Sequence, residues 1–168
     1  MSWLSYLRSA VADAEGLQLK IDLHLEAFEP LACLERWQRQ LAASCPSTNA
    51  SAAESVFIGR VRAAAADGTP LGALELEHYP GMTERQLQQL ATDCCARHGA
   101  HSCLVQHRIG RVLPGEAIVL VAIGADRRGP AQRCCQELLE ALKHNAPFWK
   151  REWRRDGTGE WLTSNTPL

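Results

Sequence analysis

A helix that must end at a fixed point is the feature that most constrains how this 168-residue chain can fold. Pro130 suits the first position of a helix, and Pro147 blocks any continuation. Lys143 lies four residues after Leu139 and extends the apolar face, so the pattern directs a lysine toward packed surface at the helix end. The apolar residues of this face recur at helical spacing, at Ala131, Cys134, Cys135, Leu138, Leu139 and Leu142.

A second lysine, Lys150, follows in the run Ala146-Pro147-Phe148-Trp149-Lys150-Arg151-Glu152, which we expect to form a proline-broken aromatic corner. One interpretation is that Lys143 complements the helix dipole, worth about 0.3–1 kcal/mol, with its stem along the apolar face. The other is an anion site in which desolvation makes a lysine usable as an acid, base or nucleophile. Residues 127–155 carry eight Lys and Arg against three acids, in a chain of net charge -1. This excess favours a negatively charged ligand.

Periodicity and turn residues indicate a mixed fold. The strands that we predict are 19–25, 56–62, 71–77, 103–108 and 117–123, and the helices are 30–43, 83–98 and 130–145, with a polar connection over 45–55. The first helix should have an apolar side formed by Leu31, Leu34, Trp37 and Leu41. For the second we expect a capping box of Thr83 with Gln86, a hydrophobic staple of Met82 with Leu87, and a stop at Gly99.

Four blocks of sequence, in the same order and with similar spacing, resemble the large, catalytic subunit of molybdopterin synthase. No single block would suffice, but together they cover about residue 20 to residue 162, and the chain is identified as a member of this family. The blocks are 57–62 (Phe-Ile-Gly-Arg-Val-Arg), 74–84, 107–111 with 113–116, and Leu142-Lys143 with 146–152.

The resemblance implies an α+β fold of the α/β hammerhead type with a small additional antiparallel β subdomain. It also implies a single domain over 19–168, preceded by an N-terminal extension, 1–18. Members of this family are sulfurtransferases that convert cyclic pyranopterin monophosphate to molybdopterin. The sulfur arrives as a thiocarboxylate at the C-terminus of a small ubiquitin-like partner subunit. The expected assembly is a homodimer within a heterotetramer, and the resemblance implies neither a cofactor nor a metal in this subunit.

The resemblance also assigns site residues. Lys143 and Lys150 match the two catalytic lysines. We expect Lys143 to transfer a proton and hold the thiocarboxylate, and Lys150 to stabilise charge that develops as sulfur attacks the pterin. His78 and His107 are expected to be structural, hydrogen-bonded histidines. The substrate-binding candidates are Arg60, Val61, Arg62, Arg127, Arg128, Arg151 and Glu152.

Three departures from the family pattern keep an alternative open. Arg127 replaces a histidine that the family contributes across the dimer interface, which removes a group able to titrate near neutral pH. An alanine-rich stretch follows Arg62, and Asn165 stands where relatives often carry an arginine. The alternative is a catalytically weakened paralogue that acts as a partner-binding or dimer scaffold. Retention of both lysines favours the enzyme.

Composition narrows the remaining possibilities. No apolar run approaches the roughly 20 residues of a membrane span. Residues 1–18 lack the features of a signal peptide, so we expect a cytoplasmic protein, in which this segment is an extension or, alternatively, a partner-docking helix. The seven cysteines contain no C-x-x-C pair, and we expect buried, reduced thiols. The basic segment contains no recognised motif for binding nucleic acid.

Overall fold

The computed structural model describes residues 16–44 and 51–162, and its elements alternate between strands and helices. Their order is β1 (Gln18–His24), α1 (Pro30–Ser44), β2 (Ala53–Arg60), β3 (Leu71–His78), α2 (Met82–His98), β4 (Ala100–Arg108), β5 (Gly110–Val112), β6 (Ala117–Ala125), α3 (Arg128–His144), β7 (Phe148–Arg154) and β8 (Gly159–Trp161).

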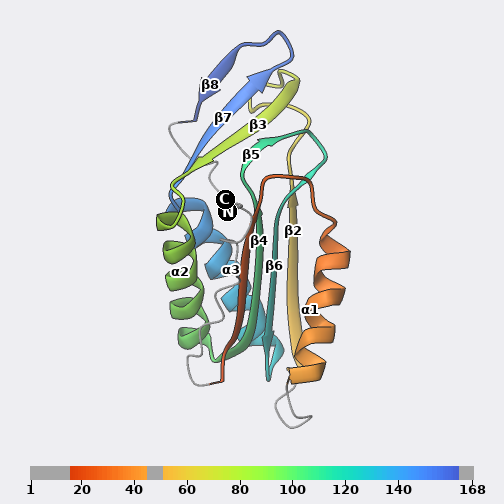
Figure 1. The fold of residues 1–168 in the computed structure, drawn as a ribbon, viewed down its shortest axis with the longest axis vertical. Helices are drawn as coiled ribbons and strands as arrows, with labels where there is room; N and C mark the ends of the chain where they lie inside the picture. Colours follow the sequence, from red (N-terminus) through yellow and green to blue (C-terminus); the bar gives the residue numbers. More distant parts are fainter. Residues whose placement is uncertain (1–15, 45–50, 163–168) are drawn as a thin grey trace, which may run out of the picture.

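The strands form two four-stranded sheets. The main sheet has the order β1-β4-β6-β2, with β1 parallel to β4 and the other pairs antiparallel. The second sheet, β5-β3-β7-β8, is antiparallel throughout and lies beyond one end of the main sheet (Figure 1). The expected α+β fold with an additional antiparallel sheet is therefore confirmed.

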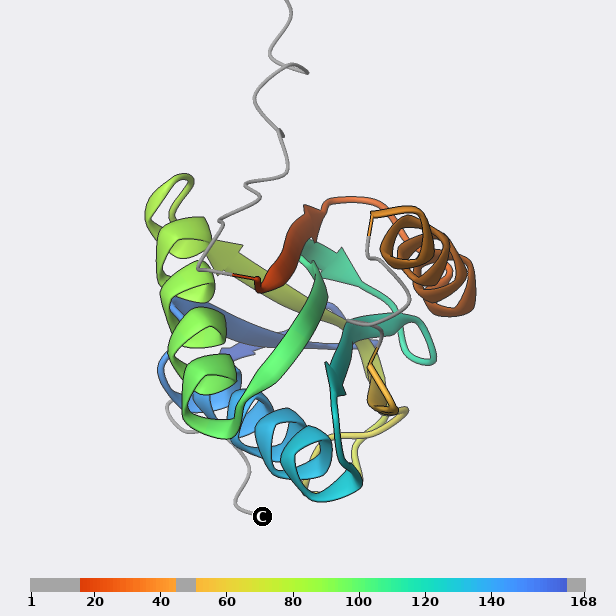
Figure 2. The same ribbon diagram turned by 90° about the horizontal axis from the view of Figure 1, so that it is seen from below.

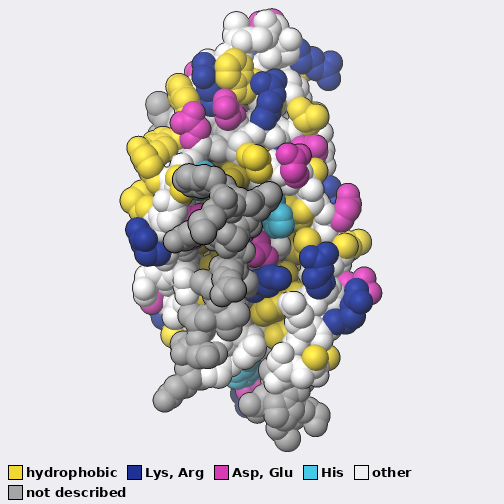
Figure 3. Space-filling view, in the orientation of Figure 1, with side chains coloured by type: hydrophobic (Ala, Val, Ile, Leu, Met, Phe, Trp, Pro, Cys, Tyr) yellow, Lys and Arg dark blue, Asp and Glu magenta, His cyan; other side chains and the backbone are white. Residues whose placement is uncertain are grey.

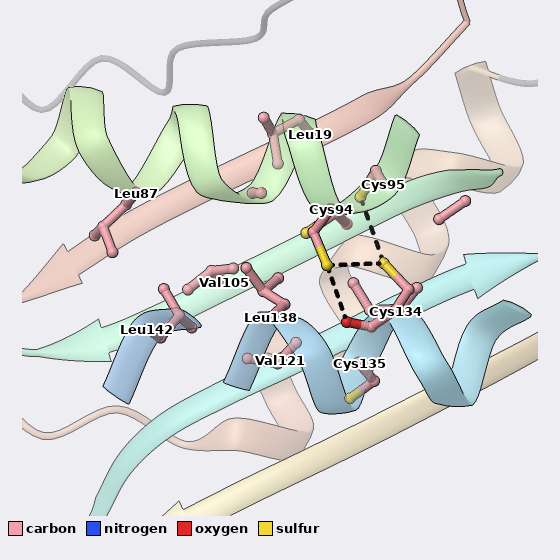
Figure 4. Packing of buried hydrophobic residues seen from close by; sticks show 14 of the residues in the cluster. Leu19, Leu87, Cys94, Cys95, Val105, Val121, Cys134, Cys135, Leu138 and Leu142 are labelled. Carbon is pink, nitrogen blue, oxygen red and sulfur yellow. Dashed lines mark hydrogen bonds between the residues drawn. The ribbon is translucent and has the colours of Figure 1, made fainter. Parts of the chain in front are cut away.

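The helices cover both faces of the main sheet (Figure 2). On one face α2 and α3 pack against β1, β4 and β6, and this core includes Leu87, Leu138 and Val121 (Figure 4). On the other face Trp37 of α1 packs against Leu104 and Leu120. Strands β4 and β6 are buried on both faces, as the continuous apolar run at 117–123 predicts.

Two details of the helices differ from the sequence prediction. Leu31 is 70% exposed, so the apolar side of α1 consists of Leu34, Trp37 and Leu41 without it. The expected capping box is wrong: Gly81 precedes α2, and its N–H donates to Glu84 Oε2 at 2.6 Å. Gly81 takes the cap because its φ of 80° is one that other residues rarely adopt. The predicted stop at Gly99 is confirmed by its left-handed φ of 64°.

The expected staple fails for the same reason, because Met82 lies inside α2 rather than before its cap. Thr83 accepts a hydrogen bond from the N–H of Tyr79 at 3.1 Å. Gln86 donates to the carbonyl of Asn145 at 2.6 Å, so it ties the start of α2 to the end of α3.

The strands also differ from the prediction: β4 begins at Ala100 rather than at 103, and the short strands β5 and β8 were not predicted. Strand β2 begins at Ala53, inside the segment predicted as a connection. More important for the site, the expected proline-broken corner is a regular strand, β7, which pairs with β3 over most of its length. Alternate residues of β7 point to opposite faces, so Phe148, Lys150 and Glu152 share one face, and Trp149, Arg151 and Trp153 share the other.

A buried arginine organises the junction between the two sheets. Arg108, at the end of β4, is only 3% exposed. Its guanidinium donates to the carbonyls of Leu25 and Arg111 at 3.1 and 2.8 Å and to Glu116 at 3.2 Å. The chain then turns at Gly110, whose φ of 70° explains why glycine occupies this position. Arg108 therefore holds β5 and the start of β6 against the end of β1.

Three predictions fall outside the described residues: the apolar face within residues 1–15, Cys45 and Asn165. Strand β1 begins at Gln18, and the adjacent Leu17 is already buried in the core. Among the helices in the described ranges, none has the length and apolar character to cross a membrane.

Candidate active site

Lys150 lies on the inner face of the second sheet, at its junction with the main core. In the β3–β7 register it stands opposite Leu76, which is 1% exposed. Its neighbour on the same face, Phe148, packs both against the main core and against the small core of Val61, Leu76 and Val112. Lys150 is therefore carried beside two apolar side chains, Leu76 and Phe148, which pack against the cores.

Lys143 approaches the same place from the end of α3. It is the penultimate residue of the helix, where the negative end of the helix dipole favours a cation. Burial lowers the pKa of Lys150, and the nearby charge of Lys143 lowers it further. The two lysines thus form a pair of close positive groups on a partly buried surface. Only three lysines occur in the whole chain, and two of them are here.

His107 forms part of the wall of this site. Its ring stacks on that of Phe148, with the centroids 4.3 Å apart and the planes 8° from parallel. Its Nδ1 donates to the carbonyl of Arg108 at 2.7 Å. Burial lowers the pKa of His107 to about 4, and the charge of Lys150 adds to this effect, so the imidazole is neutral at pH 7. The expected hydrogen bond of His107 is confirmed, and its position beside Lys150 was not predicted.

The residues at the end of β2 reach the same sheet. Arg62 forms an ion pair with Glu152 at 2.9 Å, and Glu152 shares the strand face of Lys150. Arg60 donates to the carbonyl of Gly115 at 3.1 Å, which holds its guanidinium beside the turn before β6. Val61 lies between these arginines and is buried in the small core. Glu152 therefore orients Arg62.

Arg151 does not join the lysines. Strand alternation places its side chain on the outer face of β7, where the guanidinium lies 4.1 Å from the ring of Trp153 and 5.3 Å from that of Trp161. Cation–π contacts of this kind stabilise a surface by about 0.5–1 kcal/mol each. Its sequence neighbour Lys150 faces the interior, so adjacency in the chain does not make these two residues one site.

Arg127 and Arg128 are far from the lysines of the same chain. They lie at the start of α3, and Lys143 lies near its end. At about 1.5 Å per residue, the helix separates Arg128 from Lys143 by roughly 22 Å. The basic segment 127–155 is thus divided between two ends of the molecule. On the face in Figure 3, basic and acidic side chains are interspersed over the second sheet.

The surroundings of Cys94 and Cys135 disfavour their thiolate forms. The cysteines within the described ranges are free, and all of them except Cys33 are buried. Burial raises the pKa of Cys135, and a hydrogen bond with Cys134 raises that of Cys94. Thiols in this state carry little thiolate at neutral pH, so Cys94 and Cys135 are poorly suited to carry sulfur.

Comparison with known sequences identifies the family. The model of the MoaE protein family matches residues 25–145, which is most of the chain. The chain belongs to the MoaE family. The match contains Lys143, Arg60 and Arg62, and it ends shortly before Lys150.

Individual relatives of this chain support the same family assignment. It is 43% identical over 101 residues to the molybdopterin synthase catalytic subunit of Ralstonia nicotianae, which covers 60% of this chain and 57% of that protein. The chain thus spans less than two thirds of the length of that relative. The solved structure of a molybdopterin biosynthesis MoaE protein from Burkholderia ambifaria is 35% identical, with a TM-score of 0.67 over 88% of this chain and 91% of the other.

A more distant structure shares the fold. It is a protein–protein complex of subunits 1 and 2 of molybdopterin-converting factor from Helicobacter pylori, at 21% identity and a TM-score of 0.69. The likeness covers 88% of this chain and 94% of that one.

The neutral state of His107 predicts a dependence of stability on pH. Because its pKa is about 4 when folded and near 6.5 when unfolded, the unfolded chain binds the proton more tightly. This contribution is complete above pH 6.5 and is lost as the pH falls toward 4, to a total of roughly 3 kcal/mol. Urea unfolding between pH 7 and pH 4 should show this loss in the wild type and a shallower one in His107→Gln. The half-exposed His144 supplies the control, because His144→Gln should leave this loss of stability in place. An equal dependence of stability on pH in all three proteins would contradict the assignment of the loss to His107.

Proposed function

We propose that this chain is the catalytic subunit of a molybdopterin synthase, in which Lys143 and Lys150 act on a thiocarboxylate and a pterin phosphate. The observation that carries the proposal is the pair of lysines at the junction of α3 and β7, close enough for one charge to lower the pKa of the other. Membership of the MoaE family and the name of the Ralstonia relative support it. A scaffold gains nothing from two close, partly buried cations, since each destabilises the other.

The proposed substrates are both anions, which suits this site. A thiocarboxylate or a phosphate bound between the lysines offsets their mutual repulsion, so binding of an anion is favoured beyond a single ion pair. Arg62, oriented by Glu152, supplies a further guanidinium at the same sheet. The apolar surroundings of Lys150 strengthen these interactions, because charges in a poorly solvated site are weakly screened.

The burial of Lys150 favours a division of labour that differs in one role from the one expected from the sequence: proton transfer moves from Lys143 to Lys150. A proton donor or acceptor works best with a pKa near the working pH, and Lys150 is the lysine whose pKa burial lowers. Lys143 stands at the end of a helix that is fixed by the bond from Gln86 to Asn145, which suits it to hold an anion in place. We therefore assign proton transfer to Lys150 and binding of the thiocarboxylate to Lys143.

The proposed partner is a small ubiquitin-like subunit that brings the sulfur on its C-terminal tail, and the complex of two subunits in Helicobacter pylori supports this assignment. A second copy of the chain completes the proposal. Arg127 and Arg128 cannot reach the lysines of their own chain, so they serve catalysis only at the site of a neighbouring copy. The free thiols of the described residues fit a reducing, cytoplasmic setting for this assembly.

Activity is tested by conversion of cyclic pyranopterin monophosphate to molybdopterin, with purified protein and thiocarboxylated partner. Lys143→Ala and Lys150→Ala should each reduce the rate at least about 100-fold, or roughly 2.7 kcal/mol of transition-state stabilisation. The matched control is Lys20→Ala, which removes the third lysine of the chain, on β1 beside Asp22, and should keep near wild-type activity.

Arginine substitutions separate the two roles in the same assay. Arginine stays charged but does not give up its proton, so Lys143→Arg should retain more activity than Lys150→Arg. The opposite order would support the assignment expected from the sequence. Wild-type protein that binds the partner tightly but forms no product would contradict the proposed function and favour a scaffold.

The contribution of a second copy is tested by complementation. A chain with Lys143→Ala is co-expressed with one that carries Arg127→Ala and Arg128→Ala. If sites are shared between copies, each mixed dimer keeps one intact site, and the mixture should recover about a quarter of wild-type activity. No recovery above the separate variants would show that the arginines do not act across an interface.

A further inference from the structure

A second cluster of reactive side chains lies between α2 and α3, away from the lysine site. Cys94 and His98 are four residues apart on α2 and so share one helix face. Glu137 faces them from α3, with its Oε2 2.5 Å from His98 Nε2. One ligand atom from each of these three residues lies within 4.8 Å of the other two. Thiolate, imidazole and carboxylate are the donors with which proteins bind zinc.

Cys134 brings a second sulfur to this cluster from α3. Its Sγ lies 3.9 Å from that of Cys94, and the two sulfurs point toward each other across the helix pair (Figure 4). With zinc–sulfur bonds of about 2.3 Å at the tetrahedral angle, two cysteine ligands stand about 3.8 Å apart. The observed separation therefore fits two thiolates on one zinc ion, provided that the Cys134 side chain turns toward His98 and Glu137; its Sγ also lies 4.0 Å from that of Cys95.

Arg97 holds the carboxylate without blocking it. Its guanidinium donates to Glu137 Oε1 at 2.8 and 2.5 Å, and His98 contacts the other oxygen, Oε2. A cation between His98 and Oε2 needs these two atoms about 3.3 Å apart, a shift of less than about 1 Å. Arg97 then remains on Oε1 and fixes the ligand from outside, as second-shell partners of metal sites do.

The cluster also has a path for a cation. Cys94 and Cys134 are fully buried, whereas the side chains of His98 and Glu137 are 18% and 40% exposed. The site is thus open to solvent on its imidazole–carboxylate side and closed on its sulfur side. The burial that keeps the thiols protonated does not prevent binding, because a coordinated thiol loses its proton to the metal.

We propose that Cys94, His98, Glu137 and Cys134 bind Zn²⁺, or a divalent cation of similar softness, and that this ion fastens α2 to α3. The ligands share no residue with the lysine site. The cluster includes His98, the last residue of α2. Gln86, near the start of α2, contacts the end of α3 beside Lys143. The ion has a structural role: it fixes the helix that carries Lys143 and takes no part in sulfur transfer.

The test is metal binding by tag-free, full-length protein. Equilibrium dialysis against Zn²⁺ should load about one ion per chain and raise the melting temperature, and Co²⁺ should give the charge-transfer absorption of a cobalt–thiolate bond. His98→Ala and Glu137→Gln alter the solvent side of the cluster, so they should fold, and each should weaken binding at least tenfold. Cys94→Ser and Cys134→Ser should each weaken the thiolate band.

The control is Cys33→Ser, which removes a half-buried thiol on α1 and should bind the ion like the wild type. Two results would overturn the proposal: Zn²⁺ bound equally well by His98→Ala and Glu137→Gln, or Co²⁺ bound without a thiolate band. In either case the cluster is an ion pair of Glu137 with Arg97 and His98, placed over thiols that serve only to fill the core. Neither result bears on sulfur transfer, which is measured separately.

Discussion

The stack of Phe148 on His107 is the contact on which the arrangement of this molecule depends. Phe148 opens β7 and packs against the main core and the small core of Val61, Leu76 and Val112, and His107 belongs to a central strand of the main sheet. The stack fixes the second sheet against the first, and through strand alternation it also fixes the direction of Lys150. The same apolar contact that joins the sheets thus removes water from the lysine, and its pKa falls as a result.

Helix α3 carries residues of three separate groups of charged or reactive side chains. Its end presents Lys143 to β7, its middle presents Cys134 and Glu137 to α2, and its start carries Arg127 and Arg128. Because a helix is a rigid spacer, these groups cannot meet within one chain. A count of positive residues along the sequence suggests a single basic site, but the fold divides it into a lysine pair and an arginine pair.

Much of this structure follows from local pattern. The apolar face of α3, its arrest before Pro147 and the inward direction of Lys143 are visible as helical periodicity, which depends only on neighbouring residues. Strand β7 was not predicted, because its alternation sets aromatic and charged residues on both faces rather than apolar against polar. What makes Phe148 to Arg154 a strand is pairing with β3, some 75 residues earlier, and long-range pairing leaves no local mark. An alternation count over 148–154 would have separated Lys150 from Arg151.

The candidate site, too, could be predicted from the sequence only in part. Lys143, Lys150 and Glu152 came from the family resemblance, which compares residues in order along the chain. The place of His107 beside Lys150, and the meeting of Cys94 with Glu137, arise only when distant segments pack together. Gly81 replaced Thr83 as the helix cap for a related reason: the cap was decided by backbone conformation rather than by side-chain preference.

The central claim is that burial and the charge of Lys143 together lower the pKa of Lys150. It is tested most directly by NMR titration of the Lys150 side chain in the wild type and in Lys143→Met. The account predicts that Lys150 titrates below the ordinary lysine value of about 10.4, and that Lys143→Met moves its pKa back upward. A Lys150 that titrates at the ordinary lysine value, or that does not respond to Lys143→Met, would show that the two lysines do not form one site.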